Sequence, residues 1–364
     1  MELWSGGVEV VVLNPTFWSG RRVFLSGHTG FKGGWLALWL RELGADVMGY
    51  ALPAATTPSL WCEARLHEVV SGELADVRDF RRLSMVLHSF QPEMVLHLAA
   101  QPLVRESYHT PADTYATNVM GTVNLLEAVR CCESVRAVLV VTSDKCYENH
   151  EWVWPYREQD ALGGHDPYSS SKACVELLCA SWRESFLREA GVALATARAG
   201  NVIGGGDWSA DRLLPDIFRA WQAGEALALR YSQAVRPWQH VLDPLHGYLG
   251  LLQGLMEQGS PLDSAWNFGP DADGVATVGE VVEQLARLWP GEACWQEESG
   301  NPPHEARLLT LDSSKARRQL GWRPRWSLKE ALERTFDWHH AWCAGEDMQA
   351  FSRAQIAAYQ GGTP

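Results

Sequence analysis

The chain lacks the features that mark metal-binding, secreted or membrane proteins. Its eight cysteines are scattered, with no CxxC pair and no histidines at the spacing of a metal site. The first twenty residues contain no Lys or Arg, so they lack the charged start of a secretory signal. No apolar run approaches the roughly 20 residues that a membrane span requires. We therefore expect reduced thiols, no metal, an N-terminal extension and a cytoplasmic protein that does not enter a membrane.

Positive charge is also scarce. The chain has 31 Lys and Arg residues against 44 Asp and Glu residues, a net charge of −13. This excess would repel a phosphate backbone, so nucleic acid is not an expected partner. An anionic small substrate remains compatible, because local arginines and helix N-termini can dominate inside a cleft.

The pattern of apolar residues indicates an α/β fold. Short β-rich runs at 23–26, 46–50, 94–98, 137–142 and 192–198 alternate with helical patterns over 33–43, 113–132 and 168–190. This alternation predicts a Rossmann-type doubly wound parallel sheet. The alternation ends after Asn201, at GGGDWSADRLLP. We expect residues 1–203 with 238–258 to form the Rossmann domain, and residues 204–237 with 259–364 to form a smaller C-terminal lobe.

A glycine-rich loop follows the first predicted strand and opens the first predicted helix. In GHTGFKG, one glycine permits a tight turn, one lets the backbone approach a pyrophosphate, and one lets helix pack on strand. The small residues that end the fourth strand would let a dinucleotide lie on the strand ends. The expected cofactor-binding residues are Gly27, Thr29, Gly30, Phe31, Lys32, Gly33, Asp76, Val77, Leu98, Ala99, Ala100 and Gln101.

The choice between NAD and NADP is left open by these residues. The acidic residue expected at the end of the second strand is absent from Tyr50-Ala51-Leu52-Pro53. Lys32 could favour a 2′-phosphate, or it could be a solvated lysine on the first helical turn.

A tyrosine and a lysine lie four residues apart in a predicted helix. Tyr168 and Lys172 share one helix face, and a nearby ammonium lowers the pKa of a phenol. The phenolate could then take a proton from a sugar hydroxyl as hydride leaves its carbon. Ser143, at the end of a predicted strand, completes the set.

These residues resemble the Ser/Thr-Tyr-Lys triad of the extended short-chain dehydrogenases/reductases, and Asn118 in NVMGTVNLLEA matches that branch. The resemblance covers nearly the whole chain, and GHTGFKG and SDKCYE are similar to signatures of the CDP-glucose 4,6-dehydratases. It implies bound NAD and a CDP-glucose substrate. It also implies that Ser143 hydrogen-bonds the reacting oxygen, that Lys172 and Asn118 serve the cofactor site, and that the product enters deoxysugar biosynthesis.

The residue after the triad serine separates a dehydratase from an epimerase of the same fold. Asp144 matches the aspartate that protonates the departing 6-hydroxyl in related dehydratases. Most of them then have a glutamate that removes the C5 proton, but Lys145 stands here. Lys145, Glu148 or a water are the candidates for this base.

The expected substrate residues lie in and around the smaller lobe. Arg236 offers a planar fork that matches phosphate oxygens, and the resemblance implies that it clamps the diphosphate. Glu305 would hold the nucleotide ribose. The full expected set is Asn201, Gly206, Asp207, Arg212, Arg236, His240, Asn267 and Glu305.

The resemblance further implies a homodimer or homotetramer through the helices near 113–132 and 168–190. Two other functions compete with a nucleotide-sugar dehydratase. An epimerase or other sugar-nucleotide dehydrogenase would leave Asp144 and Lys145 without a special role. A non-catalytic NAD sensor would have no need of Ser143, Tyr168 and Lys172.

Overall fold

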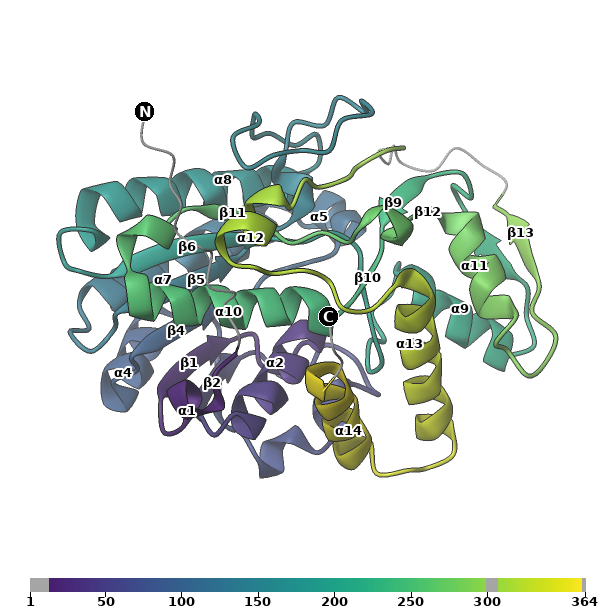
Figure 1. The fold of residues 1–364 in the computed structure, drawn as a ribbon, viewed down its shortest axis with the longest axis horizontal. Helices are drawn as coiled ribbons and strands as arrows, with labels where there is room; N and C mark the ends of the chain where they lie inside the picture. The colour runs from purple at the N-terminus through teal and green to yellow at the C-terminus, as the bar shows by residue number, and fades with distance from the viewer. Residues whose placement is uncertain (1–12, 299–306, 362–364) are drawn as a thin grey trace.

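The computed structural model describes residues 13–298 and 307–361, which fold around a central parallel sheet flanked by helices (Figure 1). Its seven strands lie in the order β11-β6-β5-β4-β1-β2-β3, and every neighbouring pair is parallel. The strands are β1 (Arg22–Ser26), β2 (Asp46–Ala51), β3 (Ser71–Leu74), β4 (Met94–His97), β5 (Ala137–Val141), β6 (Ala193–Arg198) and β11 (Ala265–Asn267). The predicted Rossmann-type sheet is confirmed.

Alternate strand residues face opposite sides of this sheet, and each side carries its own apolar core. Val23 and Leu25 of β1 pack in the core that includes α2 and α10, while Phe24 packs in the core that includes α4, α7 and α8. Both faces are therefore covered, as a parallel sheet requires. The covering helices are α2 (Phe31–Glu42), α10 (Leu242–Gln258), α4 (Phe80–Phe90), α7 (Gly121–Arg130) and α8 (Pro167–Trp182).

The two long predicted helical stretches are both present, and each contains a π-helical turn. The first consists of α6 (Pro111–Tyr115), the π turn Ala116–Met120 and α7, and the second of α8 and the π turn Arg183–Leu187. Asp166 caps α8 by accepting a 2.9 Å hydrogen bond from the Ser169 amide. The capped first turn fixes the place of Tyr168 at the carboxyl edge of the sheet.

Two strands of the sheet were not predicted, and one of them corrects the predicted domain boundary. Residues 265–267, expected in the smaller lobe, form β11 and pair with β6 at the edge of the main sheet. Three residues are too few to give a clear periodic signal. The expectation that residues 238–258 belong to the Rossmann domain was partly wrong, because β10 (Gln239–His240) pairs with β7 (Val202–Ile203) and not with the main sheet. The remaining division into domains stays a prediction.

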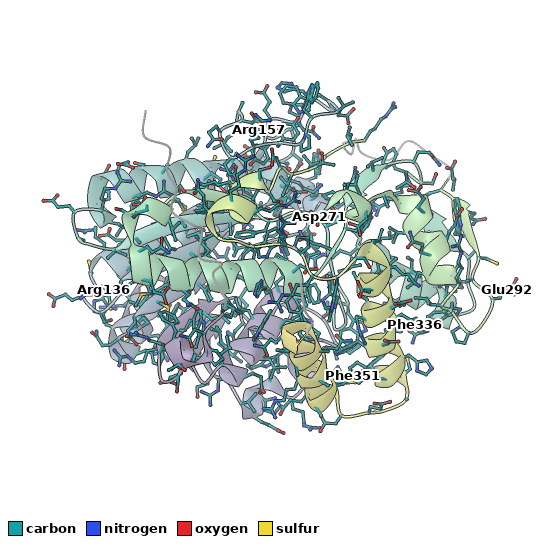
Figure 2. The ribbon with its side chains drawn as sticks, viewed as in Figure 1. Arg136, Arg157, Asp271, Glu292, Phe336 and Phe351 are labelled. Atoms are coloured by element: carbon teal, nitrogen blue, oxygen red, sulfur yellow. The ribbon has the colours of Figure 1, made fainter. Side chains whose placement is uncertain are left out.

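The smaller lobe lies at one end of the molecule. Figure 2 shows Glu292 at its outer edge and Arg136 at the opposite end of the molecule. The lobe contains the strand pairs β8 (Leu227–Leu229) with β13 (Trp295–Glu297) and β9 (Val235–Pro237) with β12 (Val275–Thr277). Its helices are α9 (Leu213–Gln222), α11 (Val278–Ala286) and α13 (Leu328–Cys343).

The remaining helices are short, except for the last one. They are α1 (Pro15–Trp18), α3 (Leu60–Glu63), α5 (Val104–His109), α12 (Ser314–Gln319) and α14 (Met348–Gly361). The last helix, α14, returns to α2, where Arg353 Nε lies 2.9 Å from Glu42 Oε1. In the described ranges, no helix combines the length and apolar character needed to cross a membrane.

Candidate active site

The glycine-rich loop joins β1 to α2 at the carboxyl edge of the sheet. Gly27 has φ +80°, and a Cβ there would lie 2.7 Å from the Ala99 amide nitrogen. A Cβ on Gly33 would lie 1.9 Å from the Gly27 carbonyl oxygen, so this glycine lets α2 pack on the loop. Gly30 is exposed and its Cβ would meet only the Gly27 oxygen, at 3.4 Å. The loop thus leaves open space above Gly30, at the N-terminus of α2, which fits the pyrophosphate of a dinucleotide.

The loop after β4 is held in place by an asparagine from the π turn. Asn118 is buried and its Oδ1 accepts a 2.8 Å hydrogen bond from the Gln101 amide. Its Nδ2 donates to the Gln101 carbonyl at 3.1 Å and to Ser171 Oγ of α8 at 2.9 Å. Asn118 therefore ties the end of β4 to the helix that carries Tyr168.

On the expected adenine side of the cofactor site, the acidic residue that usually ends the second strand is absent. Tyr50, the penultimate residue of β2, is buried and donates a 3.1 Å hydrogen bond to the Asp76 carbonyl. The Asp76 carboxylate pairs with Arg78, whose Nη2 lies 2.7 Å away, and this hydrogen bond lowers the pKa of Asp76. These contacts lie within the protein and do not test cofactor binding, so Asp76 and Val77 remain predicted cofactor contacts.

Ser143 and Asp144 lie together at the end of β5. The Ser143 hydroxyl donates to Asp144 Oδ1 at 3.0 Å and accepts from the Lys145 amide at 3.2 Å. Asp144 Oδ2 is buried without a hydrogen-bond partner, beside Gly200, where a Cβ would approach it to 2.8 Å. Burial raises the pKa of Asp144, although Lys145, the Ser143 hydrogen bond and more distant cations oppose the shift. Burial thus favours the protonated form of this carboxyl group relative to an exposed aspartate.

Tyr168 and Lys172 lie on the same face of α8, close to Ser143. Burial raises the pKa of Tyr168 to about 12, against the lowering effects of a Ser143 hydrogen bond and of Arg212. Burial also lowers the pKa of Lys172 to about 8, and its Nζ donates a 3.2 Å hydrogen bond to the Val141 carbonyl. In the protein without its cofactor, desolvation outweighs the lowering effects of Ser143 and Arg212, and the expected effect of Lys172 on the Tyr168 pKa stays a prediction.

Lys32 is not a lysine in open solvent. It is half-buried, and the charges that act on it are Arg212, Asp144, Lys172 and Asp207. Those residues belong to the catalytic cluster and to the loop before α9. The structure therefore gives no support to a role for Lys32 in binding a 2′-phosphate.

Two arginines border the same cluster. Arg212 Nη1 lies 2.8 Å from Asp207 Oδ2, and Arg212 acts electrostatically on Tyr168. Arg236, on β9, is buried and acts electrostatically on Asp144. Asn201 follows β6 and is half-buried. Arg212 and Arg236 thus act on the predicted catalytic groups, and the substrate contacts of all four residues stay predictions.

Two expected substrate residues are packed into the protein interior instead. His240 is fully buried, with ring contacts to Trp35 and Trp326, and burial lowers its pKa to about 3. The Asn267 amide accepts from Tyr147 Oη at 2.7 Å and donates to the carbonyls of residues 156 and 312. Its amide groups are thus engaged internally, and we no longer assign either residue to the substrate.

The glycine run at 204–206, which contains the expected substrate residue Gly206, is buried as well. A Cβ on Gly205 would lie 2.0 Å from the Trp338 ring, and one on Gly206 would lie 2.7 Å from Leu60. These glycines therefore make room for large side chains, and the substrate contact predicted for Gly206 remains untested. Glu305 lies outside the described residues.

A buried ion pair that was not predicted from the sequence joins α8 to β6. Glu176 Oε2 lies 2.8 Å from Arg198 Nη2, and both side chains are 3% exposed. Glu176 also accepts a 2.6 Å hydrogen bond from Thr196, while Arg198 Nη1 donates to Tyr147 Oη at 2.7 Å. Glu176 lies four residues after Lys172 on the same helix face, and that spacing is a signal that could have identified it.

Comparisons with known proteins agree with this geometry. A family model described as GDP-mannose 4,6 dehydratase matches residues 24–335. A CDP-glucose 4,6-dehydratase of Salmonella typhimurium is 50% identical over 357 residues, which cover 97% of this chain and 99% of that protein.

Solved structures with low identity show the same fold. An epimerase of Methanothermobacter thermautotrophicus has a TM-score of 0.79 at 23% identity, covering 91% of this chain and 96% of its own. A dTDP-glucose 4,6-dehydratase of Bacillus anthracis, solved in complex with NAD, has a TM-score of 0.73 at 20% identity. That match covers 88% of this chain and 97% of the other.

Proposed function

The chain belongs to the GDP-mannose 4,6-dehydratase family, and from this premise we propose that it converts CDP-glucose to CDP-4-dehydro-6-deoxyglucose and water, with NAD as cofactor. The observation that carries the proposal is the buried Asp144 carboxyl beside Ser143 and Tyr168. An epimerase needs to remove and return hydrogen at one carbon, whereas a dehydratase also needs a proton donor for the departing hydroxyl. The similarity to the Salmonella typhimurium enzyme supports CDP-glucose as the substrate.

The glycine-rich loop and the neighbouring strand ends would hold the dinucleotide. Gly30 offers open space at the N-terminus of α2, and Asn118 fixes the loop that follows β4. A bound NAD would supply the hydride chemistry at C4 and C6, and the positive charge of its oxidised ring would favour ionisation of a nearby phenol.

Three residues serve the oxidation at C4. Tyr168 takes the proton of the C4 hydroxyl, and Ser143 hydrogen-bonds the same oxygen. Lys172, anchored to the Val141 carbonyl, supplies a positive charge on the Tyr168 face of α8. These roles resemble those of the family and are supported by the burial of all three side chains.

Asp144 serves the elimination. Burial raises the pKa of this carboxyl group, which lies one hydrogen bond from Ser143, and we assign it the role of proton donor. This proton goes to the C6 oxygen, which leaves as water when the C5 proton is removed. We assign the diphosphate of the nucleotide to Arg236 and Arg212, together with the predicted substrate residues Asn201 and Asp207.

A panel of nucleotide hexoses, each incubated with the enzyme and NAD, tests this function by mass spectrometry. We expect CDP-glucose to lose the mass of one water, and UDP-, GDP- and dTDP-glucose to remain unchanged. Interconversion of epimers without loss of water would instead support the epimerase function. Tyr168→Phe is the matched inactive control, because it removes only the oxygen that accepts the proton.

We also propose a homodimer or homotetramer formed through the helices around α8. Exposed apolar side chains gather on these neighbouring elements: Tyr108 on α5, Met120 in the first π turn, Leu177 on α8 and Phe186 in the second π turn. A second copy of the same face would cover them. The predicted cytoplasmic location also remains part of the proposal.

A further inference from the structure

The turn that carries the proposed acid is tied at both ends to one buried ion pair. This short 3₁₀ turn, Asp144–Cys146, is called the acid turn below. Before it, the Thr142 hydroxyl donates a hydrogen bond to Glu176 Oε1. After it, the Tyr147 hydroxyl accepts a 2.7 Å hydrogen bond from Arg198 Nη1. Glu176 and Arg198 are the two members of the ion pair that joins α8 to β6.

The same ion pair holds the helix that carries the other proposed catalytic groups. Glu176 lies on α8 one turn after Lys172 and two turns after Tyr168. Its carboxylate accepts hydrogen bonds from Thr196 Oγ1 at 2.6 Å and from Arg198 Nε at 2.9 Å, and both donors belong to β6. One buried pair therefore bonds to both catalytic elements, and its geometry sets where they lie relative to each other.

The hydrogen bonds of the Tyr147 hydroxyl have a defined direction. The hydroxyl accepts from the Arg198 guanidinium and donates to Asn267 Oδ1 at 2.7 Å. Asn267 Nδ2 donates to two backbone carbonyls, at 2.9 and 3.2 Å, so its oxygen is the atom that faces Tyr147. The Arg198 guanidinium carbon also lies 4.8 Å from the centre of the buried Tyr147 ring. The phenol thus connects the end of the acid turn to β6 and β11.

Backbone hydrogen bonds at this end of the acid turn go to a different part of the protein. The Glu148 amide donates to the Ala161 carbonyl, and the Gly163 amide donates to the Cys146 carbonyl, both at 2.9 Å. These bonds tie the turn to the loop before α8. The Tyr147 side chain supplies a contact with the central sheet that these backbone bonds do not.

We propose that Thr142 and Tyr147 are positioning residues for the elimination step. Bonded to the buried ion pair, they hold the acid turn at a fixed place relative to α8. Asp144 can then meet the C6 oxygen of a sugar whose C4 hydroxyl lies at Tyr168. This inference rests on the proposed function. Both hydroxyls bond to other residues of the protein, so their effect on the reaction passes through the acid turn.

Elimination should depend on these contacts more than oxidation does. The helix α8, which carries Tyr168 and Lys172, has 16 residues and its own N-terminal cap, and Tyr147→Phe leaves its ion pair with β6 in place. Asp144, by contrast, lies on a turn of three residues. A misplacement of about 1 Å can slow a reaction about 10²-fold.

The test compares Tyr147→Phe with a matched control, Tyr156→Phe. The two buried rings stack with their centres 5.1 Å apart. The Tyr156 hydroxyl bonds the His150 amide and the Asn149 side chain, at 2.7 and 3.0 Å. Each variant therefore loses one hydroxyl from the same stack, but Tyr156→Phe keeps the contact of the acid turn with Arg198.

Each enzyme is incubated with NAD and a range of CDP-glucose concentrations. Absorbance of reduced nicotinamide measures C4 oxidation, and loss of water by mass gives kcat and KM for dehydration. Without substrate, hydrogen exchange measured by mass spectrometry follows the amides of the acid turn, and thermal unfolding checks that each variant folds.

For Tyr147→Phe we expect kcat for dehydration to fall about 10- to 100-fold while C4 oxidation persists, so that reduced nicotinamide accumulates. KM for CDP-glucose should stay near the parental value, and the amides of the acid turn should exchange faster. Tyr156→Phe should keep the parental kcat and accumulate no reduced nicotinamide, whatever its thermal stability. A merely structural role of Tyr147 would lower the melting temperature without this separation of the two steps.

Two variants of Thr142 test the other end of the acid turn and keep the proposal testable if Tyr147→Phe does not fold. Thr142→Val keeps the shape but loses the bond to Glu176, so it should also slow dehydration and accumulate reduced nicotinamide. Thr142→Ser keeps the hydroxyl and should restore the parental behaviour.

Three results would overturn the proposal: parental dehydration in folded Tyr147→Phe or Thr142→Val, a change confined to KM, or the same accumulation of reduced nicotinamide in Tyr156→Phe. They differ from failure of the proposed function, in which the wild-type enzyme itself would not dehydrate CDP-glucose.

Discussion

The Ser143 hydroxyl donates a 3.0 Å hydrogen bond to Asp144 Oδ1, and both side chains are buried at the end of β5. The same serine hydrogen-bonds Tyr168. One hydroxyl therefore joins the group proposed to gain a proton at C4 to the group proposed to lose one at C6. Oxidation and elimination thus share one buried hydrogen-bonded unit, which allows their effects to be separated by single substitutions.

Asp144→Asn should stop the reaction between these two steps. The amide keeps the shape of the carboxyl group but cannot donate its proton, and loss of a positioned general acid slows such a step about 10²–10⁴-fold. Mixed with NAD and CDP-glucose, the variant should accumulate reduced nicotinamide, up to one per active site, with little dehydrated product. Stopped-flow absorbance and mass spectrometry measure the two quantities. Dehydration at the parental rate would show that Asp144 is not the acid.

Two glycines of the same loop should respond differently to an added methyl group. Gly30→Ala has open space in the protein alone, so its thermal stability should stay near the parental value while NAD binding weakens. Gly33→Ala forces a Cβ against the Gly27 carbonyl, so it should lower the melting temperature. Differential scanning fluorimetry and NAD titration check both. Unchanged NAD affinity in Gly30→Ala would argue that the backbone at this position does not approach the cofactor.

Glu176→Gln should destabilise the fold strongly. It leaves the Arg198 guanidinium buried without its counter-charge, a change that costs about 3–5 kcal/mol in buried pairs. Urea unfolding measures the loss. The matched control is Glu184→Gln, which removes an exposed ion pair with Arg188 and should cost less than about 1 kcal/mol. Equal effects of the two substitutions would contradict the structural role of the buried pair.

Asp243 should make stability depend on pH. Burial raises its pKa to about 7, against hydrogen bonds from the Arg325 amide and the Tyr359 hydroxyl, which favour the ionised form. The folded state therefore binds more protons than the unfolded state from about pH 4 to about pH 7, and its stability falls as the pH rises through this window.

Asp243→Asn should remove that contribution. As the pH rises from 4 to 7, the unfolding free energy of the variant should increase relative to that of the parent. Urea unfolding at several pH values measures it, with the exposed Asp46→Asn as control. A constant difference across the window would mean that Asp243 is ionised in the folded protein throughout.

Leu177→Arg should weaken the proposed association of subunits. Leu177 is 62% exposed on α8, so a charge there costs little in a monomer but opposes burial against a second copy. Light scattering after size exclusion should show a smaller mass than for the parent. Trp295→Arg, at the outer edge of the smaller lobe, should leave the mass unchanged. A parental chain that is already monomeric would refute the proposed oligomer.

The sequence by itself determined the architecture and singled out the residues that we propose as the catalytic triad. The strands from β1 to β6 other than β3 were predicted because buried parallel strands form continuous apolar runs between helices of regular period. Ser143, Tyr168 and Lys172 were recognisable because each stands at a fixed offset from a strand end or a helix turn. Asp144 followed from its place beside Ser143.

Only the tertiary structure decided where the charged side chains meet. Lys32, Asp144 and Arg212 are far apart in the chain, and no local pattern predicts that parallel strands bring them to one edge of the sheet. The tertiary structure also shows that His240 and Asn267 lie in the interior, where they contact residues from distant segments of the chain. Local periodicity fixes which face of an element is buried, but the pKa of Tyr168 depends on the desolvation and charges that only packing creates.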